Sequence, residues 1–551
     1  MLLRTVNYIT HWTDSLGYVA FFEPGMMDQP VFFGVLSDGY QFDSERHLQL
    51  RSTDRAATIA HTAEEDAATD PFDAGLILHT TTNGSAVVYV KRTQLAERAY
   101  RLTGGGLYRD SVLLGLPAPV PSPLLDRSGV VEQDTLMASH RPYRGRRYIF
   151  FGDSACPRSR RQDNCDGTGM YSVGATTCEP STEGCSTKGD TPPVLDYFIS
   201  TEASGFSHPL PMAPMEPLDR NTWIACILAT RPTPHPSAHG DITMTNQTMY
   251  AVFMKPAPNT SETDITGVLK WSDEQSQFQL VTYWPLKNFV ATTNFATAAR
   301  GVQRFAPSSS KLPSESDPSA PSDDDGYFYL TMSFVYMRVP EHQLANLSAY
   351  EAFTPLLANS SLEQPVLDPA GWGWKQGAVP VLQSDEAKLI ALGVLPPSEA
   401  HFQVRDVTSG HTLGVGIGTV NYNEALGQYL LITEYSSTDR RGAIFAGVSS
   451  SLTGPWTYVT PVLSHDVTGA SCYNPLHMPW MDEEGGRFIY VACSYTAMWS
   501  DKNNPNSQWY TCLTGVDSYQ NCATPVPRYE YNNMVYRLDV TLLKSALQPK
   551  T

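Results

Sequence analysis

The 551-residue chain has no cysteine before Cys156, although nine follow from there. No two of them are spaced as Cys-x-x-Cys and no histidine lies at zinc-finger distance, which argues against a structural zinc site. The sequence therefore indicates no metal and no other cofactor, and local disulfides are the better interpretation. The expected pairs are Cys156–Cys165, Cys178–Cys185, Cys472–Cys493 and Cys512–Cys522, with Cys226 left as a free thiol.

Long apolar runs are also missing, so the sequence predicts no membrane span, and the N-terminus shows no apolar core of signal-peptide length. Asn-x-Ser/Thr triplets nevertheless occur at Asn83, Asn246, Asn259, Asn346 and Asn359. Together with the cysteines they favour a secreted or extracellular glycoprotein whose signal peptide is not visible. A cytosolic protein with reduced thiols is the alternative.

Positive charge is scarce, because 38 Lys and Arg stand against 56 Asp and Glu, a formal net charge of −18. This balance argues against nucleic acid or an anionic membrane as the main partner. A neutral or cationic ligand fits better.

Long helical stretches of Ala, Glu, Lys and Leu are absent, whereas Tyr (28), Pro (41) and Gly (39) are abundant. This composition favours short strands joined by turns, and hence an all-β protein. The strand candidates are 31–36, 85–90, 147–151, 249–254, 278–283, 327–332, 428–433, 487–492 and 533–538.

The proline-rich segment 117–123 predicts a stiff linker and a domain boundary near residue 125. Residues 1–125 then form a β-rich extension of unknown role. Residues 126–545 are too many for one sandwich and suit a β-propeller. The polar segment 307–325 is expected to be a disordered insertion, since it has little apolar surface to bury.

Two aspartates stand at the ends of apolar β-type segments. Asp134 follows Gly129-Val-Val-Glu-Gln, and Asp153 follows the run Tyr148-Ile-Phe-Phe-Gly. Glycoside hydrolysis needs two carboxyl groups flanking the bond, one as proton donor and one as base or nucleophile. The alternative is that both are ordinary turn aspartates.

Segments in order along residues 126–500 resemble the domain-of-unknown-function 4185 family, some of whose members are five-bladed β-propeller glycosidases acting on D-arabinofuranose polymers. The segments are 129–154, 327–354, Trp372-Gly-Trp374, 420–430, 446–456 and 473–490. The sequence departs from the family at Gly414-Val-Gly-Ile-Gly-Thr, where an acidic step would be expected.

The resemblance implies a five-bladed propeller with Asp134 and Asp153 as the acidic pair. Glu434 and Glu202 are further candidates for a catalytic carboxylate, although Glu434 could instead pair with Arg440 or Arg441. The candidates for substrate binding are Trp372, Trp374, His477, Asn474 and Tyr473, with core packing as the alternative for the tryptophans and His477.

The sequence thus predicts a monomeric glycoside hydrolase of the arabinanase or arabinofuranosidase type, whose partner is a polysaccharide or oligosaccharide. Two other readings remain open. One is a propeller that binds carbohydrate without cutting it, since a fold does not fix a function. The other is a polysaccharide lyase, for which an acidic protein is a poor host because the substrate is anionic.

Overall fold

The computed structural model describes short strands within residues 2–92 and then a larger body. That body comprises residues 94–102, 136–154, 171–178, 193–198, 222–231, 233–236, 242–245, 247–256, 263–284, 326–332, 335–358, 360–435, 442–463, 471–496 and 531–548. The predicted insertion at 307–325 and the cysteines of three expected disulfides lie outside these ranges, except for the backbone of Cys178.

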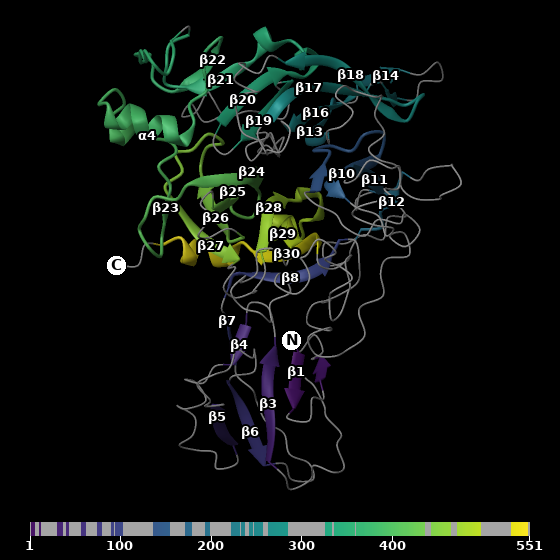
Figure 1. Ribbon diagram of the computed structural model, residues 1–551, viewed down its shortest axis with the longest axis vertical. Coiled ribbons are helices and arrows are strands. Elements are labelled where there is room, and N and C mark those ends of the chain that lie inside the picture. The colour runs from purple at the N-terminus through teal and green to yellow at the C-terminus, as the bar shows by residue number, and fades with distance from the viewer. Residues whose placement is uncertain are drawn as a thin grey trace.

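Five antiparallel sheets form a ring, so the predicted all-β, five-bladed propeller is confirmed (Figure 1). The first blade contains β9 (Leu136–Ala138), β10 (Arg146–Ser154), β11 (Tyr171–Cys178) and β12 (Asp196–Tyr197), and the second β13 (Trp223–Ala229), β16 (Met249–Pro256), β17 (Thr263–Ser272) and β18 (Gln277–Trp284). The third contains β19 (Tyr327–Met332), β20 (Val335–Pro340), β21 (Glu351–Thr354) and β22 (Gly373–Gln376).

The fourth blade is built from β24 (Val415–Asn423), β25 (Gln428–Tyr435), β26 (Ile444–Ser449) and β27 (Tyr458–Leu463). A short strand, β23 (Arg405–Asp406), joins its outer edge in parallel with β27. The fifth blade contains β28 (Ser471–His477), β29 (Phe488–Thr496) and β30 (Tyr531–Asp539).

The outer strand of the fifth blade comes from the other end of the chain. β8 (Ala96–Arg101) pairs antiparallel with β30, and its residues Ala96 and Tyr100 are buried. The propeller therefore takes one strand from before the predicted boundary at 125, and the division into two domains stays a prediction. This pairing links the two ends of the described body in one sheet.

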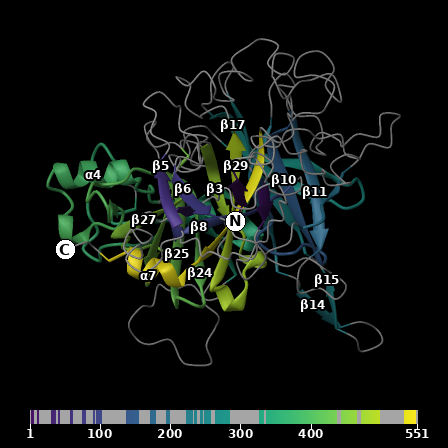
Figure 2. The same ribbon diagram turned by 90° about the horizontal axis from the view of Figure 1, so that it is seen from below.

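The predicted β-rich N-terminal extension is also confirmed. β1 (Leu2–Thr5), β2 (Thr10–Trp12), β3 (Pro30–Leu36), β5 (Ala57–His61) and β6 (Ala74–His79) form one sheet, while β4 (Tyr40–Phe42) pairs with β7 (Val90–Arg92). Figure 1 shows these strands gathered at one end of the molecule, and Figure 2, which is seen from that end, shows β3, β5 and β6 in front of the propeller.

A few elements lie outside these sheets. They are the hairpin β14 (Thr233–Pro236) and β15 (Ile242–Thr245), the helices α4 (Gln383–Ala391) and α7 (Thr541–Ala546), and the 3₁₀ turns η3 (Glu341–Gln343), η4 (Leu347–Ala349), η5 (Pro397–Glu399), η7 (Pro479–Met481) and η8 (Glu484–Gly486). Among the described helices, none is long and apolar enough to cross a membrane.

Stacking of blades explains the continuous apolar runs of the sequence. β25 is buried at five consecutive positions from Tyr429 to Thr433, because neighbouring sheets cover both of its faces. Its preceding turn closes at Gly427, whose φ of +63° is a left-handed conformation that glycine adopts without steric cost. The run that looked like a strand in sequence is thus a central strand of a blade.

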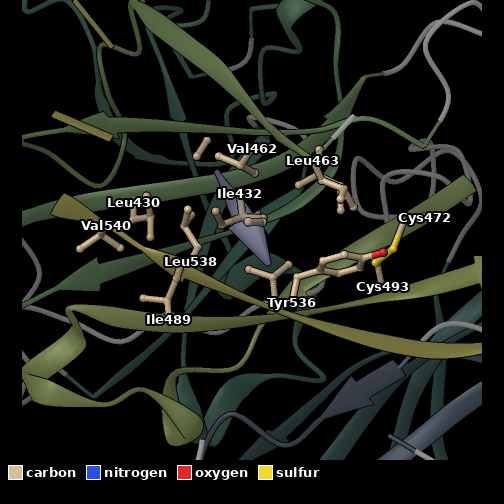
Figure 3. Close-up of a cluster of buried hydrophobic side chains, with 14 of the residues drawn as sticks. Leu430, Ile432, Val462, Leu463, Cys472, Ile489, Cys493, Tyr536, Leu538 and Val540 are labelled. Atoms are coloured by element: carbon tan, nitrogen blue, oxygen red, sulfur yellow. A yellow bond between two sulfur atoms is a disulfide. The ribbon is translucent and has the colours of Figure 1, made fainter. Parts of the chain in front are cut away.

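A core cluster joins the fourth and fifth blades (Figure 3). Ile432 and Val462 from one blade pack with Ile489 and Leu538 from the other. Figure 3 also shows the Tyr536 ring pointing toward the Cys472–Cys493 disulfide. This disulfide confirms one predicted pair, and Cys226 is a buried free thiol as expected.

Four strands at the centre of the ring run in the same direction. β24 packs against β28, β28 against β9, and β9 against β13. A parallel bridge joins Ser139 to Ile227, and Arg147 reaches both the Ser139 carbonyl after β9 and the Trp480 ring after β28. We call the edge at which β9, β13, β24 and β28 begin the leading edge, and the edge at which they end the trailing edge.

Candidate active site

The first predicted pair lies next to β9 and within β10 in the sequence. β10 is antiparallel to β9, with Phe151 opposite Leu136, so the last residues of β10 lie at the leading edge. Asp153 is the last residue but one of β10, and its side chain lies outside the described residues. Asp134 precedes β9 by two positions and also lies outside them, as does Glu202.

Glu434 reaches the same edge from the fourth blade. It lies near the end of β25, which is antiparallel to β24, with Tyr435 opposite Val415, the first residue of β24. The backbone N–H of Asn474 donates to Glu434 Oε2 at 2.7 Å. The structure therefore brings together two residues that the sequence proposed for different roles, and it does so across the junction of two blades.

Asn474 is buried at 4% exposure, and its neighbour Tyr473 is half-buried in the same strand, β28. The alternative partners proposed for Glu434, Arg440 and Arg441, lie outside the described residues. The contact with Asn474 places the Glu434 carboxylate at the inner strand of the fifth blade.

His477 lies at the opposite end of β28, at the trailing edge. It is only 2% exposed, and its Nε2 atom is 3.0 Å from Asp482 Oδ1. Asn421 Nδ2 lies 3.2 Å from His477 Nδ1, and the His477 backbone N–H donates to Thr419 Oγ1 at 3.2 Å. These contacts join β24 to β28, so the structure uses His477 to hold two blades together.

Trp372 lies beside the outermost strand of the third blade, β22. Its Nε1–H donates to the Glu399 carbonyl at 2.9 Å. Its ring stacks on Phe353 at 5.3 Å between centroids and lies 4.6 Å from the His401 ring. Because β22 is the edge strand of its sheet, Trp372 packs at the periphery of the propeller.

Trp374 lies within β22 and packs against Phe353 and Tyr329, with ring centroids 5.5 Å apart in each pair. The Arg338 guanidinium lies 5.0 Å from the Trp374 ring and also forms an ion pair with Glu351 at 2.6 Å. Both tryptophans thus pack against aromatic rings, and their part in substrate binding stays a prediction.

Several residues of this region were not singled out by the sequence. Thr419 and Asn421 belong to the segment Val420-Asn-Tyr-Asn and its preceding residue, but nothing local shows that they bond to His477. Asp482 follows His477 by five positions, a spacing without a recognisable signal. Among the described residues, no group of three or more His, Cys, Asp or Glu gathers as a metal site.

Comparisons with known proteins add a distant likeness. No protein-family model matches the chain, and no curated protein does. The resemblance to the domain-of-unknown-function 4185 family therefore stays a prediction.

Among solved structures, a protein from Bacteroides ovatus ATCC 8483 aligns with a TM-score of 0.43 and 13% identity, over 78% of this chain and 90% of that one. An exo-β-1,3-galactanase from Phanerochaete chrysosporium gives 0.33 and 9%, over 76% and 66% of the two chains. One from Clostridium thermocellum gives 0.29 and 8%, over 66% and 58%. These values assign no family and transfer no activity.

Proposed function

We propose that the chain is a glycoside hydrolase whose catalytic carboxylates, Asp134, Asp153 and Glu434, act at the leading edge of the propeller. The proposal rests on one observation, the contact between the fourth and fifth blades at that edge. Glu434 at the end of β25 reaches the start of β28, on the edge where β9 begins and β10 ends.

Glycoside hydrolysis needs carboxyl groups in two protonation states. The carboxyl in the more apolar setting keeps its proton and donates it to the leaving oxygen, while an ionised carboxylate acts as base or nucleophile. A leading edge formed by strand ends from several blades supplies such groups from distant parts of the chain. Rigid strands then hold them at fixed separations, which favours reaction through correct orientation.

We propose a furanose-containing or related polysaccharide, arabinan-like, as the substrate. A net charge of −18 disfavours anionic polymers and is compatible with a neutral glycan. In this proposal Tyr473 and the Asn474 side chain, on the innermost strand of the fifth blade, contact substrate hydroxyls.

The test is release of reducing sugar from a panel of arabinans, galactans and related glycans. Asp134→Asn, Asp153→Asn and Glu434→Gln should each lower kcat about 10²- to 10⁴-fold, the usual range for loss of an acid or base. The matched control is Asp196→Asn, an isosteric change at a carboxylate whose side chain is 62% exposed and pairs with Arg146.

The control variant should keep wild-type kcat. If the wild type cuts no glycan but binds one, the protein is a carbohydrate-binding propeller. Full activity in all three carboxylate variants would contradict the proposed roles.

A further inference from the structure

The Glu434 carboxylate meets a backbone of unusual shape. Asn474 has a φ of +55°, a left-handed conformation that costs energy for residues other than glycine, least for asparagine and aspartate. From this conformation its N–H donates to Glu434 Oε2. The donor is therefore a peptide group that points away from the regular ladder.

A β-bulge explains that direction. Tyr473 pairs with Ser494 in β29, whereas Leu476 pairs with Ala492, so β28 has one residue more than its partner between these pairs. Asn474 and Pro475 lie within that interval. A bulge redirects the backbone and side chains of the strand that carries it. Here it turns the Asn474 N–H toward the neighbouring blade.

Space for Glu434 comes from a second strand. A Cβ atom on Gly416 in β24 would lie 2.8 Å from Glu434 Cγ and 3.1 Å from the Glu434 carbonyl oxygen. The first distance is shorter than real Cβ contacts allow. The side chain of Glu434 thus occupies room that any other residue at position 416 would fill.

We propose that Gly416 and Asn474 are positioning residues for Glu434. Gly416 opens the space in which the side chain lies, and the bulged backbone at Asn474 fixes the direction of its carboxylate. The inference rests on the proposed function for its kinetic consequence.

A spectroscopic experiment tests the contact without reference to activity. Protein labelled with ¹⁵N-asparagine is compared with Asn474→Gly to assign the Asn474 amide signal. A hydrogen bond to a carboxylate is stronger than one to a neutral acceptor. The amide proton should therefore move upfield in Glu434→Gln and in Gly416→Ala. An Asn474 signal that stays unchanged in both variants overturns the inference.

Kinetics then separate backbone from side chain. Asn474→Gly keeps the N–H and adopts φ +55° freely, so kcat should stay within about threefold of wild type while KM rises. Asn474→Val disfavours this φ, because its side chain is β-branched, and should lower kcat more than tenfold. Equal losses of kcat in the two variants would mean that the Asn474 side chain acts directly, which contradicts a positioning role.

If Asn474→Val fails to fold, Gly416→Ala takes its place in the kinetic test. Gly416→Ala should lower kcat about tenfold with little change in KM. Its matched control is Gly373→Ala, where the nearest side-chain atom lies 3.9 Å from the added Cβ, so kcat should not change. Absence of activity on every glycan would contradict the proposed function, while the amide signal would still decide the contact.

Discussion

The two ends of the junction between β24 and β28 differ in how their polar groups are used. At the trailing edge, the buried His477 ring lies between the buried Asn421 amide and the carboxylate of Asp482, whose side chain is 5% exposed. At the leading edge, the carboxylate of half-buried Glu434 accepts a backbone N–H. The trailing edge is a closed network, since buried polar groups need partners inside the protein.

This difference shows how one pair of strands serves two purposes. Polar residues that satisfy one another stabilise the contact between blades. In the proposed function, the half-buried Glu434 carboxylate at the other end of the same contact acts on a bound glycan. We therefore propose a catalytic role for the leading edge and a stabilising role for the trailing edge.

The sharpest test exchanges one carboxylate for its amide at each end. Glu434→Gln should lower kcat about 10²- to 10⁴-fold with little change in unfolding free energy. Asp482→Asn should leave kcat intact below its melting temperature but destabilise the fold by about 1 to 3 kcal/mol, because the His477 ring loses a charged partner in the interior. Kinetics and urea unfolding of both variants check this. Loss of kcat in well-folded Asp482→Asn would contradict the division.

Removal of the disulfide near the leading edge should have the second-largest effect. Cys472 and Cys493 join β28 to β29 across 21 positions of sequence. For a loop of this length, chain entropy gives about 3 kcal/mol of stabilisation. Cys472→Ala/Cys493→Ala should show this loss in urea unfolding, and reduction of the wild type should reproduce it.

Cys226→Ala is the control, because it removes a buried thiol that forms no disulfide. Its unfolding should respond to reduction as the wild type does. An unfolding midpoint of the wild type that is unchanged by a reductant able to open the bond would contradict the assigned role.

Runs of aromatic and β-branched residues in the sequence predicted several of the strands correctly. The runs at 147–151, 249–254, 327–332 and 428–433 lie in β10, β16, β19 and β25, since aromatic and β-branched residues suit a buried pleated strand. Pairing of β8 with β30 escaped prediction because it joins segments more than 400 positions apart. No local pattern specifies such a contact.

The candidate site was predictable only as a set of residue types. Glu434 was chosen for its place at the end of a strand, and the fold puts it at a junction of blades. The tryptophans illustrate the opposite case, because an indole suits a sugar platform and a packed cluster equally well. The partners of Trp372 reveal its packing, and two of them, Glu399 and His401, lie 27 and 29 positions away in the sequence.

A pH experiment probes the trailing edge. Burial, and then the nearby charges of Arg141, Arg147 and Arg231, hold the pKa of His140 well below 6.5, although a hydrogen bond to the backbone of the second blade opposes the shift. The folded state therefore resists protonation that the unfolded chain accepts. Stability from this group is full above pH 6.5 and falls as the pH drops below it, by at most about 1.4 kcal/mol per pH unit.

His140→Asn should remove that part of the slope, because the amide oxygen can still accept the Ala229 N–H that now reaches His140 Nδ1 at 3.4 Å. Urea unfolding of both proteins at several pH values between 5 and 8 measures the difference. Parallel curves for the two proteins would show that His140 titrates alike in the folded and unfolded states.

The smallest effect is expected at the periphery, away from both ends of the junction. Trp372→Phe keeps an aromatic ring against Phe353 and removes the hydrogen bond from Nε1 to the Glu399 carbonyl. The loss should be about 1 kcal/mol of unfolding free energy, the usual contribution of one such bond. KM for the best glycan should not change, because Trp372 packs beside the edge strand of the third blade, whereas Glu434 contacts the innermost strand of the fifth. A several-fold rise in KM would extend the binding surface to that strand and break the assignment of substrate contacts to the leading edge.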